Sequence, residues 1–243
     1  MKKHIPNMIT SGNLICGAIA TYFATQGAFT YAFAFICFGA LFDFFDGMVA
    51  RKLGVSGPLG IQMDSLADDI TFGLAPSMIV ASDIMLQTEQ SNYAWGYWAL
   101  AALIMAAFSA LRLAKFNIDT RQTTSFIGLA TPANAIFWGS LIAAFPELPS
   151  WGQWVPGVMM IMVLISCYLL ISEIPMFSLK FKDFTWANNK VRYIFLIGCI
   201  LLIGYCILKG ILSHNLHVIL FAGCISIVWY VTINLLNLIA DKK

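Results

Sequence analysis

Eight long apolar stretches follow one another along the chain, and they limit its fold more than any other feature does. A helix needs about 20 apolar residues to cross a hydrocarbon core of about 30 Å. The spans that we expect are residues 8–26, 31–50, 62–84, 95–114, 130–146, 154–172, 193–212 and 216–238. None of them alternates polar and apolar residues as a transmembrane β-strand does. The sequence therefore predicts an all-α fold, a polytopic bundle of about eight transmembrane helices.

The composition agrees with a membrane protein. Hydrophobic residues make up 60% of the 243 residues and charged residues 11%, whereas a soluble domain carries about 25% charged residues. Lys2 and Lys3 give the first span a basic start, but no small-residue cleavage site of a signal peptide follows. The net charge of +2 gives no indication of a nucleic-acid partner. We expect an integral membrane protein.

The positions of the basic residues predict its orientation. Lys and Arg are enriched in cytoplasmic loops. With a cytoplasmic N-terminus and eight crossings, 13 of the 14 basic residues face the cytoplasm and only Lys209 faces the other side. In a bacterium this predicts a protein of the cytoplasmic membrane with both termini and the active site toward the cytoplasm.

Four aspartates lie within 26 residues around the turn between the second and third predicted spans: Asp43, Asp46, Asp64 and Asp68. The members of each pair are three or four residues apart, so each pair shares one face of a helix. Carboxylates are costly inside a membrane and mark functional sites there. Four facing carboxylates repel one another unless cations lie between them, and such hard oxygen ligands suit Mg²⁺, Mn²⁺ or Ca²⁺.

The aspartates belong to a longer pattern, Asp43-x2-Asp46-Gly47-x2-Ala50-Arg51-x8-Gly60-x3-Asp64-x3-Asp68. At all eight fixed positions it resembles the signature of the CDP-alcohol phosphatidyltransferases. This resemblance implies a six-helix core in which an alcohol attacks the phosphorus of a CDP-linked lipid and releases CMP. It also implies that the four aspartates hold two divalent cations, Mg²⁺ or Mn²⁺, with Asp64 central. Asp68 is then the catalytic residue that accepts the proton of the incoming hydroxyl.

The first span opens with Asn7, Thr10 and Asn13 at three-residue spacing, which places them on one helix face. One interpretation is helix capping and packing. The other follows from the pattern Pro-Asn-x-x-Thr-x-x-Asn, which resembles the phosphatidylserine-forming branch of the family. The resemblance implies a CDP-diacylglycerol site made by Asn7, Thr10, Asn13, Gly47, Ala50, Arg51 and Gly60.

A cationic cluster follows the fourth span and includes Arg112, Lys115 and Arg121, with Asn117 among them. These charges either set the topology or bind an anionic acceptor. Residues 112–117, Arg-Leu-Ala-Lys-Phe-Asn, resemble a segment of the same branch. This resemblance implies L-serine as the acceptor, bound by these four residues, and we expect Arg112, Lys115 and Arg121 to meet its carboxylate.

Other functions stay open on the sequence alone. The same chemistry can use glycerol 3-phosphate or inositol as the acceptor. A divalent-cation transporter would spread acidic residues through the membrane depth or repeat them in two halves, whereas here they gather at one mouth beside Arg51. The expected partners are CDP-diacylglycerol, L-serine and membrane lipids, and family resemblance implies a possible homodimer.

Three regions are predicted along the chain: a transferase core at 1–175, an interfacial cytoplasmic segment at 176–192, and two C-terminal transmembrane helices at 193–243. The middle segment is too polar to span and carries aromatic residues such as Phe181 and Phe184 among lysines. Outside the signature, we expect Asp69 behind the site or facing solvent, and Asp83 near the outer end of its helix with a structural role.

Overall fold

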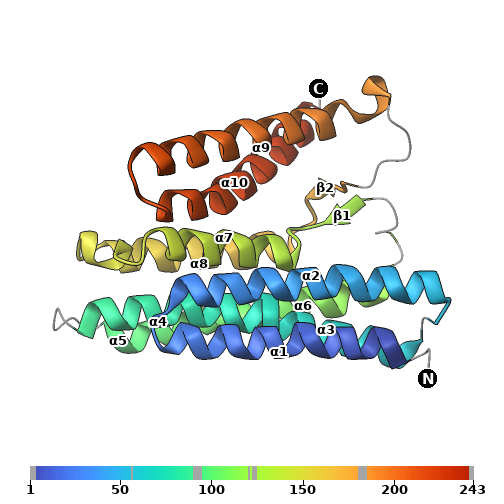
Figure 1. Cartoon of the computed structure of the whole chain (residues 1–243), viewed down its shortest axis with the longest axis horizontal. Coiled ribbons are helices and arrows are strands. Elements are labelled where there is room, and N and C mark those ends of the chain that lie inside the picture. Colours follow the sequence, from blue (N-terminus) through green and yellow to red (C-terminus); the bar gives the residue numbers. More distant parts are fainter. Residues whose placement is uncertain are drawn as a thin grey trace.

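The computed structural model of the chain describes residues 4–55, 57–89, 95–119, 121, 125–179 and 185–240. Figure 1 shows a bundle of long helices whose axes run in similar directions. The helices are α1 (Ile5–Thr25), α2 (Phe29–Leu53), α3 (Pro58–Asp68), η2 (Asp69–Leu74), α4 (Ala75–Glu89), α5 (Trp95–Trp98), η3 (Ala99–Leu103), α6 (Ile104–Ile118), α7 (Thr131–Ala144), η4 (Leu148–Trp151), α8 (Val155–Ile171), α9 (Trp186–Leu212) and α10 (His217–Ala240). The predicted all-α class is confirmed.

Five helices of the described part of the chain are long and apolar enough to cross a membrane: Phe29–Leu53, Pro58–Thr88, Gly96–Ile118, Asn188–Leu212 and His217–Ala240. Val155–Ile171 is a shorter apolar helix. The protein is therefore an integral membrane protein. Helix α7 has 14 residues, fewer than the 20 or so of a full crossing, so the count of eight crossings stays a prediction.

The helices form layers. In Figure 1 the pair α9 and α10 lies on one side of the molecule, α1 to α6 lie on the other, and α7 and α8 run between them. The middle of the bundle is dry and tightly filled, with Trp138 of α7 fully buried. Its indole nitrogen donates a hydrogen bond of 3.0 Å to Ser166 Oγ of α8, which satisfies the one polar atom of that ring.

One end of the bundle carries a short β-ladder that the sequence does not predict. Strands β1 (Ser125–Ile127) and β2 (Pro175–Phe177) pair antiparallel, with Ser125 opposite Phe177. In Figure 1 α1 begins and α10 ends at this same end of the bundle. Strand β2 includes the first residues of the segment 176–192, which was predicted to lie on the membrane surface. Helix α9 begins at Trp186, whereas the predicted span began at residue 193. Phe181 and Phe184 lie outside the described residues.

The third span is one continuous helix, Pro58–Thr88, that contains a π-helical segment. Between α3 and α4, residues Asp69–Leu74 form the π-helix η2 directly after Asp68. π-helical turns are rare and occur frequently at functional sites. The turn is anchored to α1, because Thr71 Oγ1 donates to the backbone oxygen of Asn13 at 3.0 Å. The backbone of Gly17 in α1 lies directly against Thr71.

We predict that Gly17→Ala destabilises the protein. A Cβ at Gly17 would lie 2.7 Å from the Thr71 Cα and 2.8 Å from its backbone nitrogen, and backbone atoms cannot move aside cheaply. Overpacking of this kind costs about 1–3 kcal/mol, measured as a lower thermal midpoint in detergent. Gly204→Ala is the matched control, since nothing lies within 4 Å of its added Cβ. Equal midpoints for the two variants would contradict this packing.

Candidate functional site

The four signature aspartates converge from two helices. Asp43 and Asp46 come from α2, and Asp64 and Asp68 come from α3. One carboxylate oxygen from each of Asp43, Asp64 and Asp68 lies within 4.8 Å of the other two. Asp46 stands outside this trio, but it lines the same cavity as Asp64. The predicted i, i+3 and i, i+4 spacings thus do bring the two pairs to one place.

The cluster is set back from the helix ends. Helix α2 continues for ten residues after Asp43 and ends at Leu53, and Asp64 is six residues beyond the start of α3. At about 1.5 Å per residue, these positions lie about 15 Å and about 9 Å inside the bundle. The carboxylates therefore face one another in a partly dry recess, with Asp46 and Asp68 buried.

Helix α1 holds two of the carboxylates through hydrogen bonds. Thr10 Oγ1 donates to Asp46 Oδ2 at 2.6 Å, and Asn13 Nδ2 donates to Asp68 Oδ1 at 2.9 Å. Hydrogen bonds to an ionised acceptor are about twice as strong as neutral ones. Thr10 and Asn13 are both buried, so they position carboxylates from within the bundle. The predicted contact of these two side chains with a nucleotide stays a prediction.

The trio has the properties of a divalent-cation site. Two like charges 4.8 Å apart repel by about 3–4 kcal/mol at an effective dielectric constant of 20. Asp64 Oδ1 is buried and has no hydrogen-bond partner among the described residues. A set of carboxylate oxygens without His or Cys suits Mg²⁺, Mn²⁺ or Ca²⁺. The donor set therefore fits the predicted cations.

A cavity of about 120 Å³ adjoins the carboxylates between α1, α2 and α3. Five of the seven residues predicted to bind CDP-diacylglycerol line it, namely Asn7, Thr10, Gly47, Ala50 and Gly60. The Arg51 guanidinium lies close to Gly47, since an added Cβ there would be 3.3 Å from one of its nitrogens. The glycine leaves room for this cation at the edge of the cavity.

A second cavity, of about 340 Å³, is lined by the predicted acceptor cations Arg112, Lys115 and Arg121 and also by Asp119 and Glu173. Since its lining has three cations and two carboxylates, we call it the basic cavity. Arg112 is buried, donates from Nε to the Leu129 backbone oxygen at 2.7 Å, and lies 5.6 Å from the centre of the Phe116 ring. It also interacts electrostatically with Asp68. Arg112 thus lines the basic cavity, and its charge also acts on Asp68 of the carboxylate cluster.

The other two predicted acceptor residues are differently placed. Arg121 is exposed and forms ion pairs with Asp119 at 2.8 Å and Glu173 at 3.3 Å. Hydrogen bonds to these two carboxylates raise the pKa of Arg121 further above its usual range. Asn117 donates to Ser65 Oγ of α3 at 2.7 Å and is not among the residues that line the basic cavity. Lys115 also lines this cavity and is exposed, and it forms no ion pair with any residue that the structure describes.

The structure adds two site-supporting residues that the sequence analysis missed, Tyr230 and Asn234 of α10. Tyr230 Oη donates to the Phe177 backbone oxygen at 2.9 Å, and Asn234 Oδ1 accepts from the Phe177 nitrogen at 2.9 Å. Helix α10 therefore binds both the N–H and the C=O of Phe177 in β2, and we call this pair of contacts the clamp. The only signal in the sequence was that two polar side chains interrupt a strongly apolar helix.

The residues of the clamp are connected to the basic cavity through the backbone contacts of the β-ladder. Strand β2 pairs with β1, and β1 leads to Gly128, whose nitrogen donates to the Ile174 oxygen at 2.9 Å. The next carbonyl, that of Leu129, accepts the hydrogen bond from Arg112. A chain of backbone contacts thus connects α10 to the buried guanidinium beside the carboxylates.

Two further aspartates lie outside the cluster. Asp69 is half-buried, and its Oδ1 is buried close to Gly73 and Ser109, so both predicted placements, behind the site or facing solvent, stay open. Asp83 is fully buried, and neither of its carboxylate oxygens has a partner in the part of the chain described. A structural role for Asp83 stays a prediction.

Comparison with known proteins agrees with this geometry. The model of the family described as CDP-alcohol phosphatidyltransferase matches residues 3–178. A protein of Bacillus subtilis named CDP-diacylglycerol--serine O-phosphatidyltransferase is 42% identical over 130 residues, which are 54% of this chain and 70% of that protein. The matched family region contains the carboxylates, both cavities and β2, and it ends before α9.

Two more distant relatives have the same name. The Helicobacter pylori protein is 34% identical over 134 residues, and the match covers 54% of each chain, so only about half of that relative is spanned. The Methanocaldococcus jannaschii protein is 29% identical over 201 residues, which are 82% of this chain and 84% of that protein.

We predict that a divalent cation stabilises the fold through the trio. Ligand at 100 times its Kd adds about 2.7 kcal/mol to the free energy of unfolding, so Mg²⁺ or Mn²⁺ should raise the thermal midpoint and a chelator should reverse this. Asp64→Asn should remove most of the response. Glu147→Gln, an exposed acid far along the chain, should keep it. An undiminished response in Asp64→Asn would place the cation elsewhere.

Proposed function

The chain belongs to the CDP-alcohol phosphatidyltransferase family, and we propose that within it the protein transfers the phosphatidyl group of CDP-diacylglycerol to the hydroxyl of L-serine. The products are phosphatidylserine and CMP. The observation that carries this proposal is the convergence of the signature carboxylates next to a cavity lined by cations, where the charge of Arg112 also acts on Asp68. The names of the relatives support the choice of serine.

Two divalent cations, when bound by Asp43, Asp46, Asp64 and Asp68, would neutralise the charge of the diphosphate and of the oxygens between which the phosphoryl group moves. The nucleotide end of the lipid substrate belongs in the cavity of α1, α2 and α3. Arg51 at its edge suits the diphosphate, because a guanidinium can donate two parallel hydrogen bonds to phosphate oxygens.

The serine hydroxyl oxygen attacks the phosphorus that carries diacylglycerol, and the bond from that phosphorus to the CMP oxygen breaks. The hydroxyl proton passes to the carboxylate of Asp68. Asn13 donates to one oxygen of Asp68, which holds the carboxylate in place and leaves its other oxygen for the proton. Proton acceptance must occur within hydrogen-bond reach, so the hydroxyl has to enter beside the trio.

The carboxylate of serine belongs in the basic cavity, where Lys115 is exposed and Arg112 is close to Asp68. Arg121 already has two acidic partners, so Lys115 and Arg112 carry most of this role. Glycerol 3-phosphate also presents an anion to such a cavity, whereas inositol is uncharged. The placement of Lys and Arg supports a cytoplasmic orientation of this end of the bundle and of both termini.

The direct test is an assay of CMP release by the purified protein with CDP-diacylglycerol and Mg²⁺ or Mn²⁺. Serine, glycerol 3-phosphate and inositol are offered in parallel, and we expect activity with serine. Each Asp→Asn change at positions 43, 46, 64 and 68 should abolish it while the protein remains folded in detergent. Activity with glycerol 3-phosphate alone would overturn the choice of acceptor, and full activity in a chelator would overturn the mechanism.

We predict unequal roles for the cations of the basic cavity. One charge-assisted hydrogen bond to a carboxylate contributes about 1.5–3 kcal/mol, so Lys115→Ala and Arg112→Ala should raise the KM for serine about tenfold or more. Arg121→Ala should raise it by less than about fivefold, because an exposed ion pair contributes at most about 1 kcal/mol. Lys209→Ala is the control, because Lys209 lies in the last turn of α9 and does not line the basic cavity. Unchanged serine KM in all three would mean that the charges only set topology.

We also predict that α10 positions Arg112 through the β-ladder. Tyr230→Phe keeps the ring but loses its hydrogen bond to Phe177, which is worth about 0.5–1.5 kcal/mol. The KM for serine should rise about two- to tenfold, while the KM for CDP-diacylglycerol stays the same. Tyr205→Phe is the matched control, since Tyr205 is 59% exposed on α9. A drop in thermal midpoint with both KM values unchanged would mean that the clamp is only structural.

A further inference from the structure

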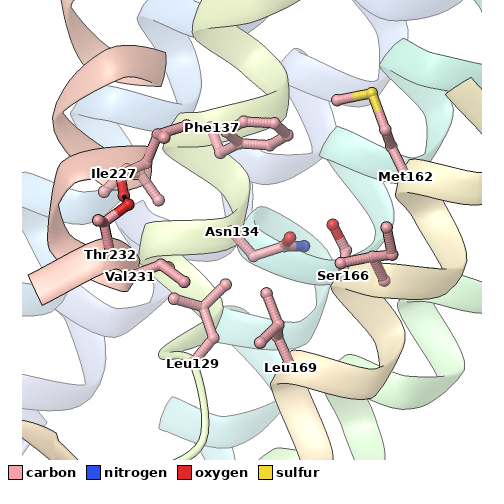
Figure 2. Close-up of a pocket in the computed structure, with 11 residues that line it drawn as sticks. Leu129, Asn134, Phe137, Met162, Ser166, Leu169, Ile227, Val231 and Thr232 are labelled. Atoms are coloured by element: carbon pink, nitrogen blue, oxygen red, sulfur yellow. Dashed lines mark hydrogen bonds between the residues drawn. The ribbon is translucent and has the colours of Figure 1, made fainter. Parts of the chain in front are cut away.

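A third cavity, of about 200 Å³, lies between α7, α8 and α10. Figure 2 shows it, with Phe137 of α7, Met162 and Leu169 of α8 and Val231 of α10 around it. None of its lining residues lines the carboxylate cavity or the basic cavity. It is thus separate from the site of the proposed reaction.

The cavity lies at the depth where a lipid passes from its polar to its apolar part. Asn134 is in the first turn of α7, Ser166 and Leu169 are near the end of α8, and Thr232 is in the last part of α10. In Figure 1 the start of α7 and the last part of α10 lie toward the β-ladder end of the bundle. The cavity is therefore within the spans but close to one membrane surface.

The rim of the cavity faces the bilayer. Ile165 of α8 and Val228 of α10 line it and are 53% and 48% exposed, respectively. Both belong to strongly apolar helices, so the medium outside them is hydrocarbon. An acyl chain can enter such an opening without leaving water, whereas a polar solute cannot reach it easily.

One polar side chain inside the cavity has no partner. Asn134 is fully buried, and neither its Nδ2 nor its Oδ1 has a hydrogen-bond partner among the described residues. Figure 2 shows this amide pointing from α7 toward Ser166 of α8. A buried amide left unsatisfied is costly, and in hydrocarbon no water relieves it. The nearby Ser166 oxygen is already the acceptor for Trp138.

We propose that this cavity binds one ester-linked acyl chain of a glycerophospholipid from the surrounding leaflet. The chain lies along Phe137, Met162 and Leu169, and its ester carbonyl accepts a hydrogen bond from Asn134 Nδ2. The occupant is a resident lipid and not the substrate, because the cavity shares no residue with the nucleotide cavity. The bound acyl chain would fill the cavity between α7, α8 and α10.

The test uses the full chain in nanodiscs with a trace of phosphatidylcholine that carries a diazirine on one acyl chain. Two versions are compared, one ester-linked and one ether-linked, because the ether lacks the carbonyl. Light-induced attachment is mapped by mass spectrometry. The ester lipid should label the cavity segments of α8 and α10 about three- to tenfold more than the ether lipid, which is the effect of one hydrogen bond.

Asn134→Leu should remove this ester preference. The variant deletes an unpartnered amide from an apolar setting, so it should fold. Val231→Trp, which fills the cavity from α10, should lower labelling by both lipids and serves as a second variant. The exposed face of α9 at Ile200 and Leu201 should label equally in every case.

Three results would overturn the proposal. Equal labelling of the cavity by ester and ether lipids in the unaltered chain would mean that Asn134 does not donate a hydrogen bond to the ester carbonyl. An ester preference that persists in Asn134→Leu would mean the same. Loss of labelling on addition of excess CDP-diacylglycerol would identify the occupant as the substrate.

Discussion

Mutual repulsion among carboxylates inside a membrane protein is the constraint on which the rest of this structure depends. Asp43, Asp64 and Asp68 bring oxygens within 4.8 Å of one another, which is unfavourable without a cation. Helix α1 relieves part of the cost through hydrogen bonds from Thr10 and Asn13. The π-helix that follows Asp68 is in turn fastened to α1 through Thr71. Helices α1, α2 and α3 therefore form one unit whose packing serves the site.

The rest of the bundle places positive charge next to this unit. Arg112 is buried, lines the basic cavity and acts on Asp68, and its position depends on the Leu129 carbonyl. That carbonyl follows β1, which is paired with β2, and β2 is clamped by Tyr230 and Asn234. Helix α10 lies beyond the residues matched by the family model, yet its Tyr230 and Asn234 bind the backbone of β2 within the matched region. On its other flank α10 forms the lipid-facing cavity with α7 and α8.

Much of this could be predicted because it rests on local periodicity. The apolar stretches located the helices, and the spacing of Asp43, Asp46, Asp64 and Asp68 placed each pair on one face. Five residues assigned to the nucleotide cavity do line one cavity, since short connections keep α1, α2 and α3 together. The end of α9 at Leu212 was predicted, but its start at Trp186 was not. The β-ladder could not be predicted either, because three-residue strands carry too little pattern and depend on a partner about 50 residues away.

The sequence by itself determined the fold class, the membrane setting and which carboxylates pair on each helix face, because each follows from residue type and from spacings within one helix. Only the tertiary structure decided which charges remain available. Arg112, Lys115 and Arg121 are alike in sequence, but one is buried beside Asp68, one is exposed, and one is paired with Asp119 and Glu173. Asp119 lies two residues from Arg121 and is visible in the sequence, but the contacts of Arg121 with Glu173 and of Arg112 with Leu129 join distant segments, and local pattern carries no information about those.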